Sequence, residues 1–418
     1  MPTTHIVGAG VSGLACAVRL AKRGMRVVLH ESAGHAGGRC RSYHDDHLDR
    51  TIDNGNHLLL SGNTAVRDYL AAIGASEELT GPPSALFPFV DLAHDLRWTV
   101  KVDPGRVPLW VFRADRRLPG TGILDYLKAL RLLGANADQS LKDVLDTDSE
   151  MFRRFWEPFA VGVLNTPAEQ GAAQLLGRVL RETFGRGGDA CMPRMARRGL
   201  SQTFVDPALA YIGNRGAEFR VGQRLRGITQ EKERVSLLHF SDHDIALDKQ
   251  DRVVLAVPPQ VAAGLLPQLK VPTRAHPIVN AHFRLSAAVR APEDAGLLGV
   301  VGGTAHWVFF RDDVVSVTVS AADDLAQQSA EEIAGLIWSD LCRAVAGISG
   351  DLPDRYRIVK ERRATFSQTP TSIRDRPDTD CGIAHLFLAG DWTNTGLPAT
   401  IEGSIRSGNA AADAVLTQ

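Results

Sequence analysis

Cysteine is scarce in this sequence, and its scarcity limits how the chain can be held together. The five cysteines, Cys16, Cys40, Cys191, Cys342 and Cys381, are odd in number, widely spaced, and never stand as a Cys-x-x-Cys pair. Disulfide frameworks and zinc sites use even numbers or closely spaced pairs of cysteines. The sequence therefore predicts no disulfide framework, no metal site and a reducing compartment.

An excess of charge of either sign is also lacking. Lys and Arg number 47, Asp and Glu number 48, and the formal net charge is −1. A chain without a net field neither holds nucleic acid nor steers an acidic substrate over long range. We therefore expect no nucleic-acid partner.

Long apolar runs are missing as well. No stretch approaches the roughly 20 apolar residues of a membrane span. Val7 to Gly13 leads straight into a glycine-rich turn, where a signal peptide would continue an apolar segment. These patterns predict a cytoplasmic protein that is either soluble or bound peripherally to the inner face of the cell membrane.

A glycine-rich turn near the N-terminus carries the first chemical signal. The segment from His5 to Leu20 predicts a short strand, a turn and a helix with one apolar face. Gly8 permits a tight turn, Gly10 lets the backbone approach a pyrophosphate, and Gly13 permits close packing of helix on strand. The first N–H groups of the helix, around Val11 and Ser12, then face the phosphates.

An acidic residue follows at the spacing that such a turn needs. A second apolar strand, Arg26 to His30, ends in Glu31, eighteen positions after Gly13. Glu31 can accept hydrogen bonds from a ribose diol, which favours FAD or NAD over a cofactor with a 2′-phosphate. The alternative is an ordinary solvated carboxylate at a strand end.

The segment after Glu31 resembles a known flavoprotein element. Gly37-Gly38-Arg39-Cys-Arg41-Ser42 is similar to the Gly-Gly-Arg-x-x-Ser/Thr sequence of flavin amine oxidases and carotenoid desaturases. The resemblance implies FAD as the cofactor, with Gly38 and Arg39 beside it. Arg39 offers a planar donor fork for phosphate oxygens, and the alternative is a solvated basic loop.

The C-terminal end resembles the same superfamily independently. A buried strand from His385 leads to Gly390 and Asp391, and a helix rich in small residues follows. The resemblance implies that Asp391, Gly390 and the helix start from Thr400 through Ile401 to Glu402 contact the flavin. A helix N-terminus there would favour negative charge on the reduced ring. Between the two ends, residues 216–228 and 251–259 resemble the hairpin beside the adenine, with Leu225 as the contact, although a core β-meander explains them equally.

A turn in the middle of the first hundred residues narrows the resemblance. Asp53-Asn-Gly55-Asn56-His57-Leu-Leu-Leu60 contains the Asp-x-Gly turn that lies beside the flavin in this superfamily, which adds Gly55 and Asn56 to the cofactor contacts. Its full form resembles the hydroxysqualene dehydroxylases, the squalene-associated FAD proteins of hopanoid biosynthesis. The further segments that resemble this family are Phe155–Pro158, Leu164–Pro167 and Arg178–Glu182.

The family resemblance implies a hydrophobic C30 isoprenoid substrate and a reductive reaction. Hydroxysqualene would lose its allylic hydroxyl with the help of an acid and gain hydride from reduced flavin N5, giving squalene. His57 is the first candidate for the acid or hydroxyl-orienting group, and Glu157 is the second, because burial would raise its pKa. Asp53 completes the set. The alternatives are that His57 is an ordinary turn residue, that Glu157 is a carboxylate at a helix end, and that Asp53 fixes the turn. The electron donor that reduces the flavin is left open.

The fold predicted is α/β with two domains. Residues 1–75, 206–269 and 356–418 would form a discontinuous Rossmann-like FAD-binding domain, and residues 76–205 and 270–355 a largely helical substrate domain. The aromatic residues Phe155, Trp156, Phe159 and Trp307 would line a hydrocarbon tunnel or form ordinary core.

One helical segment raises the question of membrane contact. Residues 123–133 combine a broad apolar face with basic residues, as an interfacial helix does, and a core helix explains the pattern equally.

Two rival functions fit parts of the sequence. The same flavin motifs serve oxidative desaturases and amine oxidases. Rab-escort and GDP-dissociation-inhibitor proteins use a related fold to bind prenylated partners without flavin chemistry, but an intact Glu31 together with Gly390-Asp391 argues against that reading.

Overall fold

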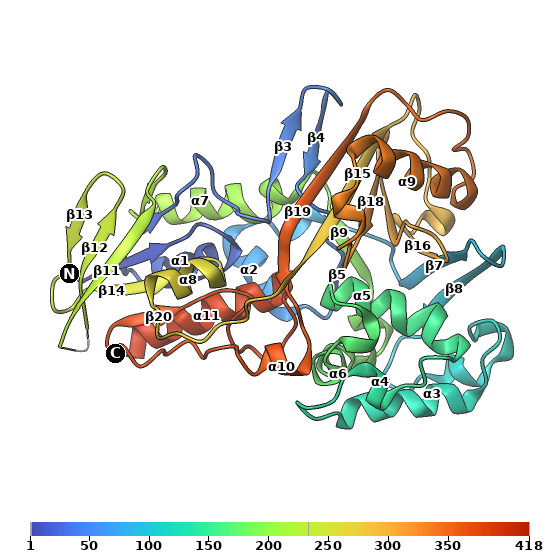
Figure 1. The fold of residues 1–418 in the computed structure, drawn as a ribbon, viewed down its shortest axis with the longest axis horizontal. Coiled ribbons are helices and arrows are strands. Elements are labelled where there is room, and N and C mark those ends of the chain that lie inside the picture. The colour runs from blue at the N-terminus through green and yellow to red at the C-terminus, as the bar shows by residue number, and fades with distance from the viewer. Residues whose placement is uncertain (1, 233, 418) are drawn as a thin grey trace.

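A parallel sheet forms one end of the molecule. The computed structural model describes residues 2–232 and 234–417, and Figure 1 shows this sheet on the left. Its strands run in the order β10 (Glu218–Arg220), β2 (Arg26–His30), β1 (Thr3–Val7), β14 (Arg252–Leu255) and β20 (Leu386–Leu388). All four neighbouring pairs are parallel. Segments from three separated parts of the chain therefore build one sheet.

Helices cover this sheet and bring the two ends of the chain together. The packed helices are α1 (Val11–Lys22), α2 (Thr64–Ile73), α7 (Asp206–Gly213) and α11 (Ile401–Thr417). Helix α1 has apolar side chains on most of its surface because it lies between the sheet and α11. A Cβ atom added at Gly408 of α11 would lie 2.1 Å from the Ser12 carbonyl oxygen, so the two helices touch at backbone distance.

A small antiparallel sheet extends the same end. It consists of β11 (Leu225–Glu231), β12 (Arg234–Phe240) and β13 (Asp244–Ala246), and α8 (Pro259–Leu265) shares a hydrophobic core with it. Leu225 is buried in that core, opposite Phe240 on β12.

A mixed sheet lies at the centre and upper right of Figure 1. Its strands are β19 (Tyr356–Phe366), β15 (Ala275–Arg284), β18 (Val314–Val319), β17 (Trp307–Arg311), β16 (Leu297–Val301), β7 (Ala85–Asp91) and β8 (Leu96–Val102), in that order. Helix α9 (Ala330–Ala344) starts at a Ser329–Glu332 capping box and buries one face against the sheet.

The remaining layer, at the lower right of Figure 1, is helical. We call residues 109–190 the helical end; it contains α3 (Ile123–Ala129), α4 (Leu141–Val144), α5 (Glu157–Leu164) and α6 (Ala173–Glu182). A π-helical turn over Phe152–Trp156 precedes α5, and a second one over Ser201–Val205 precedes α7. The short elements that connect the layers are β3 (Ser42–Asp45), β4 (Arg50–Asp53), β5 (Leu59–Leu60), β6 (Leu79–Thr80), β9 (Pro193–Ala196) and α10 (Pro370–Ile373).

Strands replace helices in much of the predicted substrate domain. Residues 270–355 supply β15, β16, β17 and β18 besides α9, which corrects the expectation that this domain is largely helical. The run Val314-Val-Ser-Val-Thr-Val319 is rich in β-branched residues, which favour strands. The helical expectation holds for residues 109–190.

The boundaries between the two domains stay a proposal, and the pairing of strand β19 changes one of them. Strand β19 falls within the predicted segment 356–418 of the cofactor domain, yet it pairs with β15 in the mixed sheet. We therefore propose a boundary near residue 366, where β19 ends.

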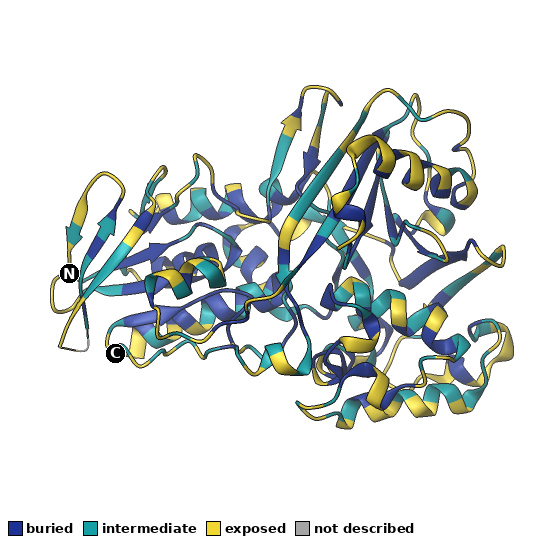
Figure 2. Ribbon diagram, viewed as in Figure 1, coloured by how far each residue is buried: buried dark blue, intermediate teal, exposed yellow. Residues whose placement is uncertain are grey.

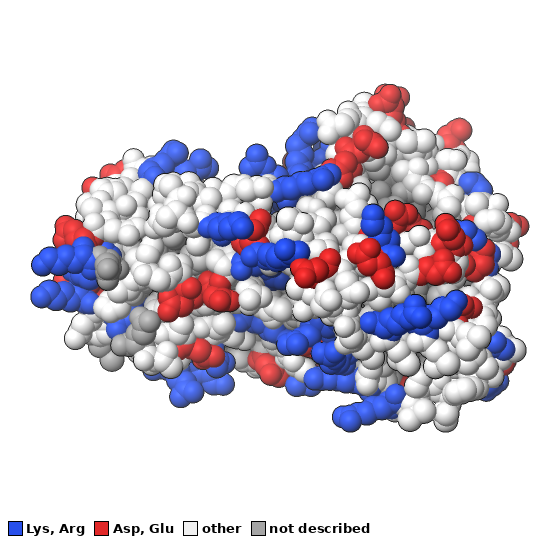
Figure 3. Space-filling view, turned by 60° about the horizontal axis from the view of Figure 1, so that its bottom comes forward, with Lys and Arg blue, Asp and Glu red and all other residues white. Residues whose placement is uncertain are grey.

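The surface and the burial pattern agree with the composition. Figure 2 shows buried strands in both sheets and exposed residues along the outer helices, and Figure 3 shows acidic and basic side chains interspersed over the face it draws. Across the described residues, every helix is too short or too polar to cross a bilayer.

Candidate functional site

Three motifs that are distant in sequence meet at the start of helix α1. The Gly37 N–H donates to the Ala9 carbonyl at 2.8 Å, which joins the Gly-Gly-Arg segment to the first glycine turn. Arg39 then donates to the Asp391 carboxylate at 2.8 Å, and Gly408 of the C-terminal helix packs on Ser12. Both ends of the chain therefore contribute to one site.

The glycine turn has the geometry that the sequence predicted. Gly8 has a φ of 109°, and a Cβ there would lie 2.3 Å from the Ala256 carbonyl oxygen. A Cβ at Gly13 would lie 1.9 Å from the Gly8 carbonyl oxygen. A Cβ at Gly10 would meet nothing within 4 Å in the described structure, so the backbone there borders open space. Two of the glycines thus serve packing, and the third leaves room for a ligand.

The N-terminus of α1 fits an anion. Gly10 caps the helix without a side-chain hydrogen bond, and its first turn holds no acidic residue. The N–H groups of Val11, Ser12 and Gly13 belong to the first turn, which has no intrahelical acceptor for them. Their free hydrogens and the helix dipole suit a pyrophosphate.

Glu31 stands at the end of β2 beside this turn. Its carboxylate accepts the Ala9 N–H at 2.9 Å and the Ala33 N–H at 2.8 Å. These two bonds fix the carboxylate next to the glycine turn. An ionised carboxylate has about four acceptor positions, so Glu31 retains capacity for hydroxyl donors such as a ribose diol.

An ion pair joins Arg39 and Asp391. Asp391 is buried, and its charge raises the pKa of Arg39 further above its usual range. Arg39 also donates to the Ala364 carbonyl, at the end of β19. Its side chain keeps 43% of its surface accessible despite these bonds. The guanidinium is therefore anchored on one side and open on the other.

Arg376 is a residue that sequence reasoning missed. It is buried and donates to the backbone carbonyls of Leu397 at 2.7 Å and Asp391 at 3.1 Å, and to that of Thr393. Burial lowers its pKa to about 10, which leaves it charged at neutral pH. It fixes the loop between Asp391 and α11. Its segment, Arg374-Asp-Arg-Pro377, carries no local motif that would have revealed this role.

Asp53 is tied into structural contacts. Its carboxylate accepts the Ser42 hydroxyl at 2.6 Å and the Leu200 N–H at 2.9 Å, and it pairs with Arg311 at 3.1 Å. The side chain is buried. These partners fix the turn, so the geometry favours the turn-fixing alternative for Asp53 over a role in proton transfer.

The turn after Asp53 is clamped to the mixed sheet by amide side chains. Asn280 of β15 donates to the Asn54 carbonyl at 3.3 Å and accepts the Thr318 hydroxyl at 2.8 Å. Asn56 donates to the Thr318 hydroxyl at 3.1 Å. A Cβ at Gly55 would lie 3.3 Å from the Asn280 side chain, so only a small residue fits comfortably there.

His57 lies close to the charges of the cofactor motifs. Burial lowers its pKa to about 4, while Asp53 acts in the opposite direction and Arg39 in the same one. The imidazole is therefore neutral at physiological pH. A neutral imidazole can donate a hydrogen bond to a hydroxyl, but it is a weak proton donor.

Glu157 lies in a different electrostatic environment from the other candidates. It begins α5 with an exposed side chain, and loss of hydration followed by repulsion from Glu169 raises its pKa, while Arg153 acts in the opposite direction. Asp53 acts on the pKa of His57, whereas neither of these residues is among the groups that shift the pKa of Glu157.

The residues at the start of α11 make contacts both within that helix and with α2. The Thr400 hydroxyl accepts the Gly403 N–H at 3.1 Å, and Ile401 is buried at the first turn. The carboxylate of Glu402 accepts the N–H groups of Ala65 at 3.1 Å and Val66 at 2.9 Å, so it caps α2. The side chain of Glu402 is therefore committed to α2, and the flavin contact at this helix start stays a prediction.

A polar junction joins the helical end to both sheets. Asn165 adopts a left-handed conformation with a φ of 44° and donates to the His276 carbonyl and the Thr365 hydroxyl, both at 3.0 Å. Gln368 donates to the Leu164 carbonyl at 2.5 Å and accepts the Ala399 N–H at 2.8 Å. The motif Leu164-Asn165-Thr166-Pro167 is thus a structural junction.

The aromatic residues of the helical end form part of a core. Trp156 and Trp307 are buried, and the rings of Phe155 and Phe159 stack at 5.7 Å. This arrangement favours the core reading of these aromatic residues.

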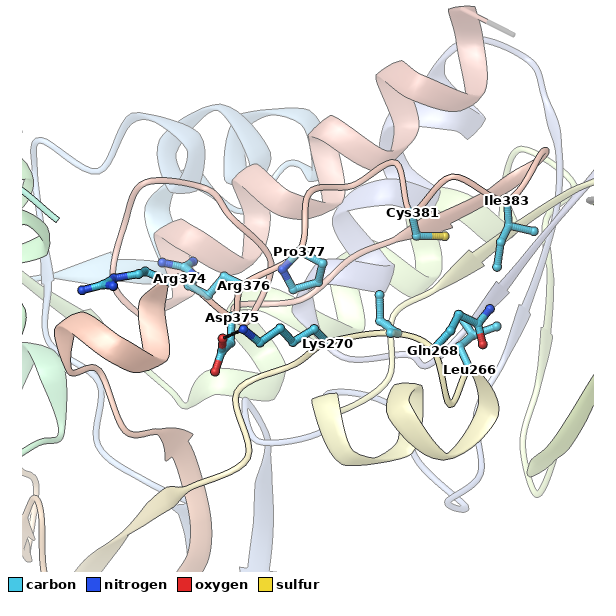
Figure 4. Close-up of a pocket in the computed structure, with 10 residues that line it drawn as sticks. Leu266, Gln268, Lys270, Arg374, Asp375, Arg376, Pro377, Cys381 and Ile383 are labelled. Carbon is cyan, nitrogen blue, oxygen red and sulfur yellow. Dashed lines mark ion pairs between the residues drawn. The ribbon is translucent and has the colours of Figure 1, made fainter. Parts of the chain in front are cut away.

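A pocket lies between the segment after α8 and the segment before β20 (Figure 4). Its volume is about 180 Å³, and Lys270 pairs with Asp375 at 2.7 Å on its wall. A site for a drug-sized ligand measures roughly 300–1,000 Å³. The pocket is therefore too small for a C30 chain, and none of the predicted site residues lines it.

The chain is similar along its whole length to proteins of a known family. The model of the flavin containing amine oxidoreductase family matches residues 11–416. A hydroxysqualene dehydroxylase of Sinorhizobium fredii is 48% identical over 99% of this chain and 98% of its own length, and one of Rhodopseudomonas palustris is 46% identical over 99% and 98%. The solved structure of cyclohexylamine oxidase from Brevibacterium oxydans superposes with a TM-score of 0.73 at 17% identity, covering 100% of this chain and 99% of that one.

The chain belongs to the flavin containing amine oxidoreductase family, the class that its fold and glycine turn define. It is a flavin-dependent oxidoreductase. Within that class it is a member of the hydroxysqualene dehydroxylase family. The predicted family resemblance, the α/β cofactor-binding fold and the flavin cofactor are thereby confirmed.

Proposed function

We propose that the protein converts hydroxysqualene to squalene by FAD-dependent reductive removal of the allylic hydroxyl. The observation that carries this proposal is the 48% identity to a hydroxysqualene dehydroxylase across 99% of the chain, in a chain whose cofactor motifs converge in space. In the balanced reaction the hydroxyl leaves as water after taking a proton, and hydride forms the new C–H bond.

The contacts among the three motifs support an assignment of the residues that would hold FAD. The α1 turn, Val11 to Gly13, would take the pyrophosphate at its N–H groups, and Glu31 would take the ribose.

Arg39 and Asp391 would lie beside the flavin end, and Gly38, Gly390, Gly55 and Asn56 would give close backbone approach. Leu225 would contact the adenine, and Thr400 and Ile401 would present the start of α11. Reduced FAD, when bound, supplies hydride to the substrate carbon.

His57 is the residue we assign to the substrate hydroxyl. Its pKa of about 4 leaves a neutral ring at physiological pH, so its part is to orient the hydroxyl by hydrogen bonding. The charge of Arg39 acts on the ring of His57, which supports a role for this histidine beside the cofactor motifs. The proton that leaves with the hydroxyl therefore comes from another donor.

Amine oxidation is disfavoured by the burial of Trp392, the aromatic residue that follows Asp391. Trp392 is 1% exposed, and its indole N–H donates to the Val257 carbonyl at 2.9 Å. A residue buried in this way cannot form a wall of an aromatic cage around an amine.

The lipophilic substrate also suggests where the protein works. We propose a cytoplasmic protein that touches the inner face of the membrane, where a C30 isoprenoid dissolves. The cysteines are unpaired in the described structure, which suits a reducing compartment.

Anaerobic single turnover tests the proposal. Enzyme reduced in the absence of oxygen is mixed with hydroxysqualene, and flavin reoxidation is followed by visible absorbance while lipids are extracted. Reoxidation with stoichiometric squalene is expected. A flavin that stays reduced, with no squalene formed, would contradict the proposed reaction and favour an oxidative desaturase.

A further inference from the structure

Apolar side chains gather on the outside of the helical end and of the segment just before it. The large hydrophobic residues there that are 53–70% exposed are Val107, Leu109, Phe112, Leu124, Leu127 and Leu130. The other exposed large hydrophobic residues in the described ranges, Val221, Val261, Leu336 and Leu416, are scattered and 37–46% exposed. Scattered residues of this kind are ordinary, whereas a cluster within one segment marks an interaction surface. We call residues 106–131 the docking surface.

The two halves of the docking surface are held together from the inside. The 3₁₀ turn Leu109–Phe112 contacts α3, and the rings of Trp110 and Tyr126 meet edge to face at 5.4 Å. The Tyr126 hydroxyl accepts the Leu118 N–H at 2.9 Å. These inward contacts leave the apolar residues of both halves pointing outward. In Figure 1 helix α3 lies at the lower edge, away from the parallel sheet, and in Figure 2 it carries exposed residues.

Basic residues accompany the apolar ones. Residues 106–131 contain six Arg and Lys against two Asp, although the whole chain is almost neutral. Three of these cations are paired, Arg113 with Asp115 at 2.9 Å, Arg116 with Asp103 at 3.0 Å and Lys128 with Asp125 at 3.8 Å. Arg106 and Arg131 are exposed and form no ion pair within the described residues. Apolar side chains next to uncompensated cations are complementary to an anionic lipid surface.

We propose that the docking surface binds the surface of an anionic bilayer and inserts Leu109, Phe112, Leu124 and Leu127 among the lipids. The purpose of this contact rests on the proposed function, because a C30 isoprenoid must pass from lipid to enzyme. A second copy of the chain is a poorer occupant, because a two-fold contact would set the same cations against each other. The docking surface thus adds a defined site to the general expectation of membrane contact.

Vesicle binding by the flavin-loaded enzyme tests the charge component. Co-sedimentation is measured with vesicles of pure phosphatidylcholine and with an even mixture of phosphatidylcholine and phosphatidylglycerol. Binding to the mixed vesicles is expected to be stronger and to weaken with added salt. Arg106→Gln and Arg131→Gln should each reduce the partition coefficient about fivefold. Failure of the wild-type enzyme to bind the mixed vesicles would overturn the proposal.

The apolar component is tested with matched variants. Phe112→Ser, Leu124→Ser and Leu127→Ser together should reduce vesicle binding by at least about tenfold. The control combines Val221→Ser, Val261→Ser and Leu336→Ser, which remove exposed apolar side chains elsewhere, and it should bind like the wild type. Flavin absorbance and the thermal midpoint verify that both variants fold. Equal binding by the two variants would overturn the proposal, as would a wild-type dimer that only the first variant dissociates.

The two proposals fail in different ways. If the enzyme binds vesicles as expected but does not reduce hydroxysqualene, the proposed reaction is contradicted and the docking surface is supported. If the enzyme reduces hydroxysqualene in detergent but does not bind vesicles, the docking surface is contradicted and the proposed reaction is supported.

Discussion

The cofactor site and the helical end are ordered by different interactions. At the cofactor site, distant segments are joined by single hydrogen bonds and one ion pair, such as Gly37 to Ala9 and Arg39 to Asp391. At the helical end, the contacts are between apolar rings, such as Phe155, Phe159 and Phe184, with centroids 5.6–5.9 Å apart. In the first region, individual hydrogen-bonding atoms determine which residue can stand at a position. In the second region, a residue needs only to be apolar and to fill the available volume. Specific motifs therefore mark the cofactor site, while the helical end tolerates many apolar solutions.

The largest effect should come from the glycines of the α1 turn. Gly13→Ala forces a Cβ against the Gly8 carbonyl, and we expect a loss of about 3 kcal/mol or more in the free energy of unfolding, together with loss of flavin. Gly10→Ala points into open space, so it should fold with less than about 1 kcal/mol change yet still lose flavin. Flavin absorbance per protein and thermal unfolding measure both. Full flavin content in Gly10→Ala would contradict the assignment of this turn.

Asn165 should matter for stability without touching the cofactor. The Ala321 N–H donates to the Asn165 side-chain oxygen at 2.6 Å, and Asn165→Ala removes this acceptor. The substitution also puts alanine at a φ of 44°. The unfolding free energy should fall by about 3 kcal/mol. Asn165→Gly loses the same bonds but should recover about 1 kcal/mol, because glycine accepts that conformation. Denaturant unfolding distinguishes the two, and equal losses would show that backbone strain has no part.

Arg39 should act on flavin affinity. Arg39→Leu removes the partner of a buried carboxylate, and we expect the flavin Kd to rise about tenfold to a hundredfold. Titration of the apoprotein with FAD measures this. Arg26→Gln is the control, because Arg26 and Glu218 form an exposed pair at 3.7 Å that should contribute little. An unchanged Kd in Arg39→Leu would remove Arg39 from the cofactor contacts.

His57 should affect the rate without setting its pH dependence near neutrality. We expect His57→Gln to lower kcat/KM about tenfold, because the substrate hydroxyl loses one orienting hydrogen bond. The folded pKa of about 4 is below the 6.5 of an unperturbed histidine, so the unfolded chain binds more protons between these values. This histidine therefore costs stability as the pH falls from 6.5 towards 4, and the variant should be less sensitive to acid there. A wild-type rate profile with a pKa near 6.5 that disappears in His57→Gln would instead identify a protonated imidazole.

Glu157 should have the smallest effect. Its side chain is exposed, and its pKa responds to Glu169 and Arg153 and to neither His57 nor Asp53, so Glu157→Gln should change kcat/KM by no more than about twofold. Steady-state assays in detergent measure this. A loss of a hundredfold would restore Glu157 as the acid and would require the helical end to approach the cofactor site.

The comparison also explains what the sequence could predict. The α1 turn, Glu31, the Arg39 segment and the Asp391 motif were predictable because their backbone geometry demands particular residues at fixed spacing. The Arg39–Asp391 pair joins two of these motifs, and each was recognised independently of the other.

Other parts were not predictable because their partners are distant. The side chain of Glu402 caps α2, and the sequence around it gives no sign that the Val66 N–H donates to its carboxylate. Arg376 and Gln368 reach across layers to backbone atoms, and no local pattern records such contacts. Strands 275–284 and 314–319 were missed because apolar runs buried on both faces show little alternation.

The most direct test of the central claim follows the hydrogen that replaces the hydroxyl. The enzyme is reduced anaerobically in heavy water, where the transferable hydrogen of reduced flavin exchanges with solvent, and a single turnover with hydroxysqualene is analysed by mass spectrometry. We predict squalene with a single deuterium at the carbon that carried the hydroxyl. Squalene without deuterium, or recovery of unchanged hydroxysqualene, would contradict hydride transfer at this flavin site.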